Sequence, residues 1–203
     1  MKCLDICLEN NFFEFNDKIY HQHGGVAIGP KMSPPYACLG LGALEAKILT
    51  TKNESFEKIL IWKRFIDDVW SLFKGTFEEA KIFVDWLNSL LPGVIKFTFD
   101  YSRATINFLD INLTFVKQQN GKTKIETNLF VKPSNRQLFL DWCSNHPIHC
   151  KKSIVYSQGL RYVMLCSNKR QLEENLAKLK SKFIQVHYPE EIIQEQFLRI
   201  EKN

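Results

Sequence analysis

The sequence Phe65-Ile66-Asp67-Asp68-Val69-Trp70 places two adjacent acidic residues between two short apolar runs, residues 59–65 and 69–73. Apolar runs of this length, separated by a polar pair, predict a hairpin with both carboxylates at its tip. Adjacent packed carboxylates repel each other and lose hydration, and a divalent cation such as Mg²⁺ removes that cost. We therefore treat Asp67 and Asp68 as candidate Mg²⁺ ligands. An ordinary polar turn is an equally open interpretation, because aspartate is favoured in turns.

The sequence before this hairpin predicts, in order, the end of a helix over residues 1–9, a small hairpin, a loop and a second helix. Asn16-Asp17 is a turn pair between apolar residues, which favours a hairpin. A glycine-rich loop follows at residues 24–29. Ser33-Pro34 then resembles an N-cap with proline at the first helical position, so we expect a helix over residues 34–49.

After the acidic hairpin, Thr76 and Glu79 form a capping-box pattern that predicts a helix ending near Pro92-Gly93. Strand alternation then returns over residues 95–99, 106–116 and 124–131, and Asn120-Gly121 predicts the turn between the last two strands. Helical patterns dominate beyond residue 132, most clearly over residues 171–185 and 189–200. The expected fold class is therefore α+β, with a helical C-terminal part.

Composition and charge narrow the class of protein. The chain has 203 residues, 45% of them hydrophobic, and no apolar run of transmembrane length or secretion signal. Its six scattered cysteines fit reduced thiols, so we expect an intracellular protein, nuclear or cytoplasmic. Net charge is +5, but residues 132–182 hold ten Lys and Arg against three Asp and Glu. This basic region fits a surface that binds phosphates, although solvated helices are often basic too.

Two cysteines and two histidines lie within eight residues of each other, at Cys143, His146, His149 and Cys150. Two Cys and two His form a plausible tetrahedral zinc set. The spacing is poor, because adjacent His149 and Cys150 are hard to aim at one ion and Pro147 stiffens the loop. We expect no zinc here, and histidines that hydrogen-bond a helix start or contact phosphate.

Several segments, taken in order, resemble the reverse transcriptases of Penelope-like retroelements. WKRFIDD (residues 62–68) is similar to the family's motif C, and the stretch from NFFEFN (residues 11–16) through HGGVAIGPKMSPPYA (residues 23–37) is similar to its motif B. IKFT (95–98) and INFLD (106–110) resemble the region that follows, and KPS (132–134) and SNHPIH (144–149) resemble thumb segments. The resemblance extends over about residues 10–168.

The resemblance implies a polymerase palm-like antiparallel sheet with helices over residues 1–131 and a thumb-like helical region over residues 132–203. Asp67 would be a catalytic metal ligand with Asp68 beside it, holding two Mg²⁺ ions in the parent enzyme. Gln22, Gly25 and Gly29 would form the wall beside template and incoming deoxynucleotide. The partner would be an RNA/DNA template–primer duplex, with no membrane involved. Expected phosphate contacts are Lys132, Arg136, Lys151, Lys152, Arg161, Lys169 and Arg170.

Some features depart from the family pattern. Its first catalytic aspartate, in motif A, lies upstream of motif B, and neither Asp5 nor Asp17 has the surroundings to replace it. Ile28, Pro30 and Met164 also differ from the residues usual at their positions. We therefore expect an RNA-directed DNA polymerase fragment that is inactive alone. The alternatives are a non-catalytic protein that holds a primer–template duplex and, ranked last, a metal-dependent nuclease using Asp67 and Asp68.

Overall fold

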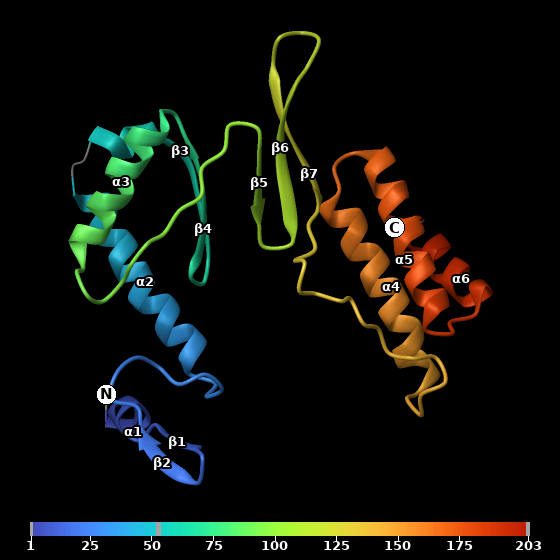
Figure 1. The fold of residues 1–203 in the computed structure, drawn as a ribbon, viewed down its shortest axis with the longest axis horizontal. Coiled ribbons are helices and arrows are strands. Elements are labelled where there is room, and N and C mark those ends of the chain that lie inside the picture. The colour runs from blue at the N-terminus through green and yellow to red at the C-terminus, as the bar shows by residue number, and fades with distance from the viewer. Residues whose placement is uncertain (1, 52–53, 202–203) are drawn as a thin grey trace. The chain divides into compact units, whose positions relative to one another are not determined.

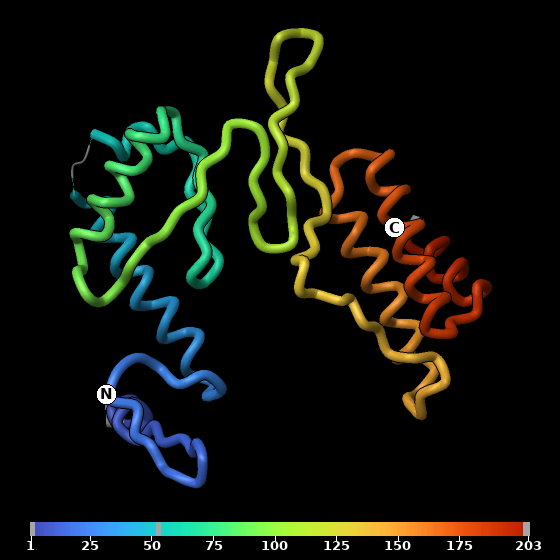
Figure 2. The backbone as a smooth tube through the Cα atoms, viewed as in Figure 1, coloured from blue at the N-terminus to red at the C-terminus, as the bar shows by residue number. Residues whose placement is uncertain are grey.

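A boundary between Phe99 and Asp100 divides the chain into two units, Met1–Phe99 and Asp100–Asn203, each with its own hydrophobic core. The computed structural model describes residues 2–51 and 54–201. Figure 1 labels the elements, and the path of the backbone can be followed in Figure 2. The class is α+β, as expected, with all strand pairs antiparallel. The strands form three separate small sheets.

The first unit begins with helix α1 (Lys2–Glu9) and the hairpin of β1 (Phe12–Phe15) and β2 (Lys18–His21). Phe15 pairs with Lys18, so Asn16 and Asp17 form the two-residue turn, with φ of 50° and 57°. Turns of this kind need positive φ at both central residues, which Asn and Asp tolerate better than most residues. The hairpin predicted from this pair is confirmed.

Helix α2 (Ser33–Thr50) and helix α3 (Phe77–Leu90) build the core of the first unit. Leu44 and Ile48 of α2 are buried with Phe83 and Leu87 of α3. Burying a side chain of this size stabilises a fold by about 1.5–3 kcal/mol. The hairpin of β3 (Ile59–Phe65) and β4 (Asp68–Phe73) packs on the same core, preceded by a short 3₁₀ helix, η1 (Glu54–Lys58).

The N-cap predicted for helix α3 is confirmed, whereas the N-cap predicted for helix α2 is wrong. The capping box of α3 is present: Glu79 N donates to Thr76 Oγ1 and Thr76 N donates to Glu79 Oε2. The N-cap expected at Ser33 is wrong, because Met32 occupies that position without a side-chain cap. Ser33 is buried, and its hydroxyl donates instead to the Ala27 carbonyl at 2.6 Å, which ties the glycine loop to α2.

The strand expected over residues 95–99 does not form. The side chain of Asn88 on α3 accepts a hydrogen bond from Phe97 N at 2.6 Å and donates to Phe97 O at 3.1 Å. Backbone groups need partners, but a side-chain amide can supply both roles. Residues 95–99 therefore have no regular secondary structure, and the end of α3 holds this segment at Phe97.

The second unit starts with a three-stranded sheet in the order β5 (Thr105–Phe108), β6 (Ile111–Lys117) and β7 (Thr123–Leu129). The single strand expected over residues 106–116 is wrong. A tight turn at Leu109 and Asp110 divides it, with Leu109 at a φ of 54°. The long β6–β7 hairpin is as predicted, and Gly121 in its turn has a φ of 77°.

Three helices complete the second unit: α4 (Ile148–Leu165), α5 (Lys169–Gln185) and α6 (Glu190–Glu201). Val155, Tyr162, Leu179, Phe183, Tyr188 and Ile193 form the shared core. Helices α4 and α6 approach closely at Gly159, where an added Cβ would lie 2.5 Å from Ile200 Cδ1 and 3.3 Å from Phe197.

The boundary at Phe99 differs from the one expected after Val131. Strand β7 explains the difference, because it is bonded to the turn between α4 and α5. Ser167 N donates to Thr127 O at 2.9 Å, Thr127 N donates to Ser167 Oγ at 2.8 Å, and Asn175 Nδ2 donates to Asn128 Oδ1 at 2.8 Å. The long hairpin therefore belongs to the unit that contains the helices.

Candidate metal and nucleic-acid site

Asp67 and Asp68 lie at the tip of the β3–β4 hairpin, as predicted. Phe65 pairs with Asp68, so Ile66 and Asp67 are the two turn residues, and Ile66 has a φ of 52°. Positive φ is unusual for a β-branched residue and costs on the order of 1–3 kcal/mol. Such strained residues persist only where their surroundings hold them, and they gather at functional sites.

Both carboxylates are exposed to solvent. The expectation that they form a crowded, dehydrated pair is therefore wrong for this chain. Asp67 is a turn residue and Asp68 belongs to the last strand pair, and water reaches both of them. Within residues 2–51 and 54–201, neither has a hydrogen bond or ion pair in the structure, which leaves their oxygens available to a hard cation.

A polar network holds the base of this turn. The Arg64 guanidinium donates from Nε and Nη2 to the two oxygens of Glu45 on α2, each at 2.8 Å. Trp62 Nε1 also donates to Glu45 Oε1, at 3.0 Å. Arg64 Nη1 donates to the carbonyl of Ile66 at 3.0 Å. One arginine thus connects α2 to the peptide that precedes Asp67.

The electrostatics of this network are those of a firm ion pair. The hydrogen bond from Arg64 lowers the pKa of the Glu45 carboxyl, and burial opposes that shift only in part. Glu45 in turn raises the pKa of Arg64 above its ordinary value. The two side chains are 26% and 18% exposed, so salt screens this pair less than an open surface pair.

The predicted nucleotide wall is only partly assembled. Gln22 and Gly25 line a hollow of about 450 Å³ between α1, the loop and the start of α2, whereas Gly29 does not. Gln22 Nε2 donates to Gly24 O at 2.8 Å, and Gly25 and Gly29 have φ of 78° and 120°. Glycine is needed at both positions for backbone reasons.

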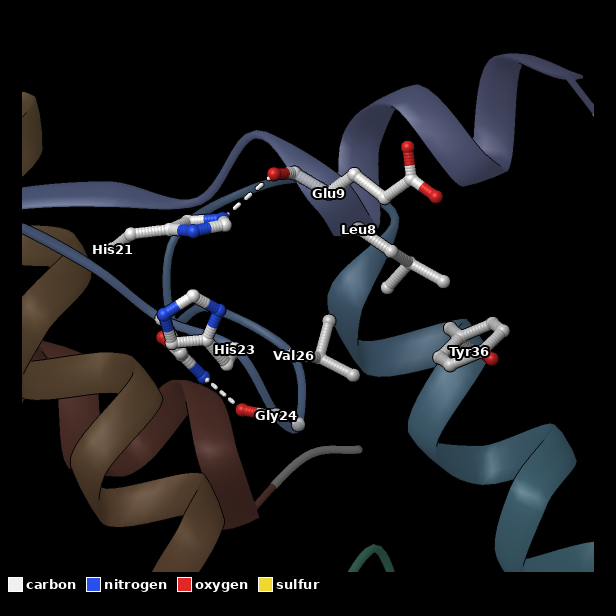
Figure 3. Close-up of a pocket in the computed structure, with 9 residues that line it drawn as sticks. Leu8, Glu9, His21, His23, Gly24, Val26 and Tyr36 are labelled. Carbon is white, nitrogen blue, oxygen red and sulfur yellow. Dashed lines mark hydrogen bonds between the residues drawn. The ribbon is translucent and has the colours of Figure 1, made fainter.

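Two histidines also line this hollow, and the sequence did not single them out. His21 Nε2 lies 2.7 Å from the Glu9 carbonyl, and the rings of His21 and His23 meet edge to face at 4.3 Å. Figure 3 shows them opposite Leu8, Val26 and Tyr36. Their signal was the pattern His-Gln-His directly before the glycines.

The acidic hairpin and the glycine loop are both bonded to helix α2. Arg64 pairs with Glu45 on that helix, and the loop is bonded to Ser33 through Ala27. Among the residues described, no hydrogen bond or ion pair joins Asp67 or Asp68 to residues 22–29. The two features are supported by the same helix, α2.

Four of the seven expected phosphate contacts are exposed: Lys132, Arg136, Lys169 and Arg170. Lys169 and Arg170 open helix α5 with side chains 90% and 88% exposed, and each faces a glutamate one turn on. Such exposed pairs contribute about 0.3–0.5 kcal/mol and do not keep a phosphate away. Lys132 and Arg136 lie in the loop between β7 and α4.

Two further expected contacts are committed to ion pairs. Lys152 lies 3.0 Å from Glu195 on α6, and Arg161 pairs with Asp110 in the β5–β6 turn. Both cations are partly exposed. Binding phosphate there would require exchange of a carboxylate partner.

Lys151 is not a phosphate contact. Its side chain is buried, and Nζ donates to the carbonyls of Trp142 and Ser144 at 2.6 and 2.8 Å. The ammonium also lies 5.1 Å from the centre of the Trp142 ring. Lys151 therefore fastens the loop before α4, and the prediction made for it is wrong.

Three exposed lysines at the free end of the β6–β7 hairpin were missed: Lys117, Lys122 and Lys124. Lys124 has Glu126 as a partner at 3.7 Å. Three lysines within eight residues, flanking the Asn120-Gly121 turn, were the available signal. They give the hairpin tip a local positive charge.

In the part of the chain that the structure describes, Cys143 gathers with Asp141 and His187, and the four residues considered for zinc do not form such a group. The ligand atoms of these three residues lie within 4.8 Å of one another. Asp141 Oδ1 accepts from Cys143 N at 2.7 Å, and Oδ2 lies 2.8 Å from His187 Nδ1. The backbone of Trp142 also donates to Val186 O at 3.0 Å. Because both oxygens of Asp141 are engaged, the group acts as a clamp on the α5–α6 turn.

One family model, described as animal helix-turn-helix domain, matches residues 138–198. The match covers the loop before α4, helices α4 and α5, and most of α6. No curated protein and no solved structure matches the chain. In the part of the chain that the structure describes, no helix has the length and apolar character needed to cross a membrane.

Proposed function

We propose that the chain is a palm and thumb portion of a retroelement reverse transcriptase, an RNA-directed DNA polymerase similar to those of Penelope-like elements. The observation that carries the proposal is the acidic turn. Two adjacent exposed aspartates lie at a two-residue hairpin turn: Asp67 is its second residue, Asp68 begins β4, and the first turn residue, Ile66, is strained at a φ of 52°. The resemblance of residues 22–37 and 62–68 supplies the chemistry that such a turn would serve.

In this proposal Asp67 and Asp68 hold Mg²⁺. Exposed carboxylate oxygens fit that ion, which prefers oxygen ligands and keeps several waters. When bound, Mg²⁺ stabilises the charges of the attacking and leaving oxygens in nucleotidyl transfer. The family carries a third carboxylate upstream of motif B, and within residues 1–21 neither Asp5 nor Asp17 has the surroundings to replace it. Losing one group that stabilises the transition state costs about 10²–10³ in rate. We therefore expect the purified chain alone to show no templated primer extension.

The second unit would grip the template–primer duplex through its phosphates. Four exposed basic side chains there, at Lys132, Arg136, Lys169 and Arg170, support this role. Each phosphate that a cation neutralises releases counterions, so affinity falls as salt rises. The helix-turn-helix match over residues 138–198 also favours a nucleic-acid partner.

Fluorescence anisotropy with a labelled RNA/DNA primer–template tests this grip. Four phosphate contacts predict a slope of about −3 to −4 in a plot of log affinity against log salt. The variant Lys132→Gln/Arg136→Gln should lower the magnitude of the slope by about 2. The matched variant Lys74→Gln/Lys81→Gln removes two exposed cations of the first unit and should change the slope little. Absence of binding by the wild-type chain at low salt would contradict the proposal.

A second candidate is a DNA-binding protein without catalysis, favoured by the helix-turn-helix match. In that class the second helix of the motif enters the major groove. Helix α5 begins with Lys169 and Arg170, whereas α6 begins with Glu190 and Glu191. Because its first residues are basic, α5 is the better candidate for the helix that enters the major groove. Equal affinity for blunt DNA duplex and for a recessed primer–template, with no effect of Asp67→Asn/Asp68→Asn on divalent-ion binding, would favour this candidate.

A further inference from the structure

We infer that Glu45 and Arg64 are positioning residues, which set the orientation of the acidic turn for metal binding. This inference rests on the proposed function of Asp67 and Asp68. The network connects helix α2, which follows the glycine loop, to the one peptide group that joins Ile66 to Asp67.

The geometry of Arg64 is suited to this role. Three of its N–H-bearing atoms are used at once: Nε and Nη2 on the two Glu45 oxygens, and Nη1 on the Ile66 carbonyl. A guanidinium is planar and rigid, so fixing two of its edges fixes the direction of the third. A lysine ammonium has no such fork and would not span Glu45 and the turn in a fixed orientation.

The Ile66 carbonyl is the right atom to hold. A peptide group is planar, so fixing its oxygen also fixes its N–H, which belongs to Asp67. Ile66 has positive φ, a conformation that its β-branched side chain disfavours. The hydrogen bond from Arg64 at 3.0 Å opposes relaxation of that strain. The Asp67 backbone is thereby held in one direction without any contact to its carboxylate.

Glu45 in turn is fixed from two sides. Its Oε1 accepts from both Trp62 and Arg64, and its Oε2 accepts from Arg64. Trp62 packs against the core of the first unit, where its ring meets Phe83 edge to face at 6.4 Å. Trp62, Glu45 and Arg64 therefore connect the turn to the core of the first unit, in addition to the strands that flank it.

The test uses Mn²⁺ as a probe of the metal site. Its affinity for the full chain is measured from paramagnetic broadening of the amide NMR signals of residues 66–69. Arg64→Lys keeps the charge but removes the fork, and should weaken Mn²⁺ binding about tenfold, the usual scale for residues that orient metal ligands. Glu45→Gln is the milder second variant, since its amide oxygen can still accept from Trp62 and from Arg64 Nε while Arg64 Nη2 loses its acceptor, and it should weaken binding in the same direction. Lys58→Gln is the matched control, because it breaks the exposed Lys58–Glu79 pair of the same unit away from the turn.

Each result has one meaning. If the wild-type chain shows no broadening at residues 66–69 that Asp67→Asn/Asp68→Asn removes, the proposed metal site itself fails. If that broadening is present, but Glu45→Gln and folded Arg64→Lys bind Mn²⁺ as tightly as Lys58→Gln, the positioning role is wrong. Weaker binding in both variants, with unchanged α3 amide signals that show an intact core, supports it.

Discussion

At the scale of single residues, the acidic turn combines two opposing demands. Positive φ at Ile66 is unfavourable for its side chain, yet the turn places Asp67 and Asp68 in solvent at the end of a firmly paired hairpin. Sequence reasoning found the aspartates because apolar strands flank them. It did not find the strain, because no glycine or asparagine marks the position.

Ile66→Gly should raise the free energy of unfolding of the first unit by about 1 kcal/mol, since glycine removes the strain but adds backbone entropy to the unfolded chain. Ile66→Val keeps the β-branched side chain and should give no gain. Urea titration followed through hairpin amide signals measures both. A loss of stability in Ile66→Gly would show that the turn is not strained.

Lys151 lies in the basic region of the sequence, but its side chain is buried and holds the loop before α4. Lys151→Met should destabilise the second unit by about 2 kcal/mol, because the Trp142 and Ser144 carbonyls lose a buried donor. Duplex affinity of the folded fraction should stay unchanged. Lys132→Gln should show the reverse pattern, with weaker duplex binding at unaltered stability. A duplex affinity that falls in Lys151→Met without any change in unfolding would restore its expected phosphate role.

At the scale of elements, local signals were sufficient where local physics decides the structure. The Asn16-Asp17 turn, the Thr76 capping box and the Asn120-Gly121 turn all formed where the sequence placed them. Each depends on residues within four positions of one another. The acidic hairpin was predictable for the same reason.

Elements decided by distant contacts were not predictable. Residues 95–99 alternate like a strand, but the side chain of Asn88 bonds both backbone groups of Phe97. The turn at Leu109 and Asp110 has a poor turn residue at its positive-φ position and is completed by Phe130 N, which donates to Asp110 O at 2.8 Å. The contact from Glu45 to Arg64 spans nineteen positions. The alternation of apolar and polar residues within a segment does not indicate which distant residue will bond to it.

The clamp on the α5–α6 turn should make stability depend on acid. The Cys143 amide and His187 lower the pKa of Asp141. A carboxyl with a lowered folded pKa adds stability above its unfolded pKa, about 3.9, and loses it as pH falls through the folded value. The stability difference between wild type and Asp141→Asn should therefore be full at pH 5 and shrink towards pH 2. Urea midpoints at several pH values measure it, and a difference that grows on acidification would contradict the clamp.

At the scale of the whole molecule, the proposed function divides two tasks between the two units. The first unit carries the acidic turn and the glycine loop, and the second carries the four exposed cations proposed to contact phosphates and the match to the helix-turn-helix family. A reverse transcriptase requires both tasks on one nucleic acid. We therefore predict that the acidic turn meets the primer end when these cations hold the duplex.

Cleavage by hydroxyl radicals tests most directly whether the acidic turn lies at the primer end. Fe²⁺ replaces Mg²⁺ in the complex of the chain with an end-labelled RNA/DNA primer–template, and ascorbate with peroxide then generates radicals at the bound ion. The account predicts cuts concentrated within a few nucleotides of the primer 3′ end. They should be lost in Asp67→Asn/Asp68→Asn and kept in Asp85→Asn/Asp100→Asn, which removes two other exposed carboxylates. Uniform cutting along the duplex, or the same pattern in both variants, would contradict it.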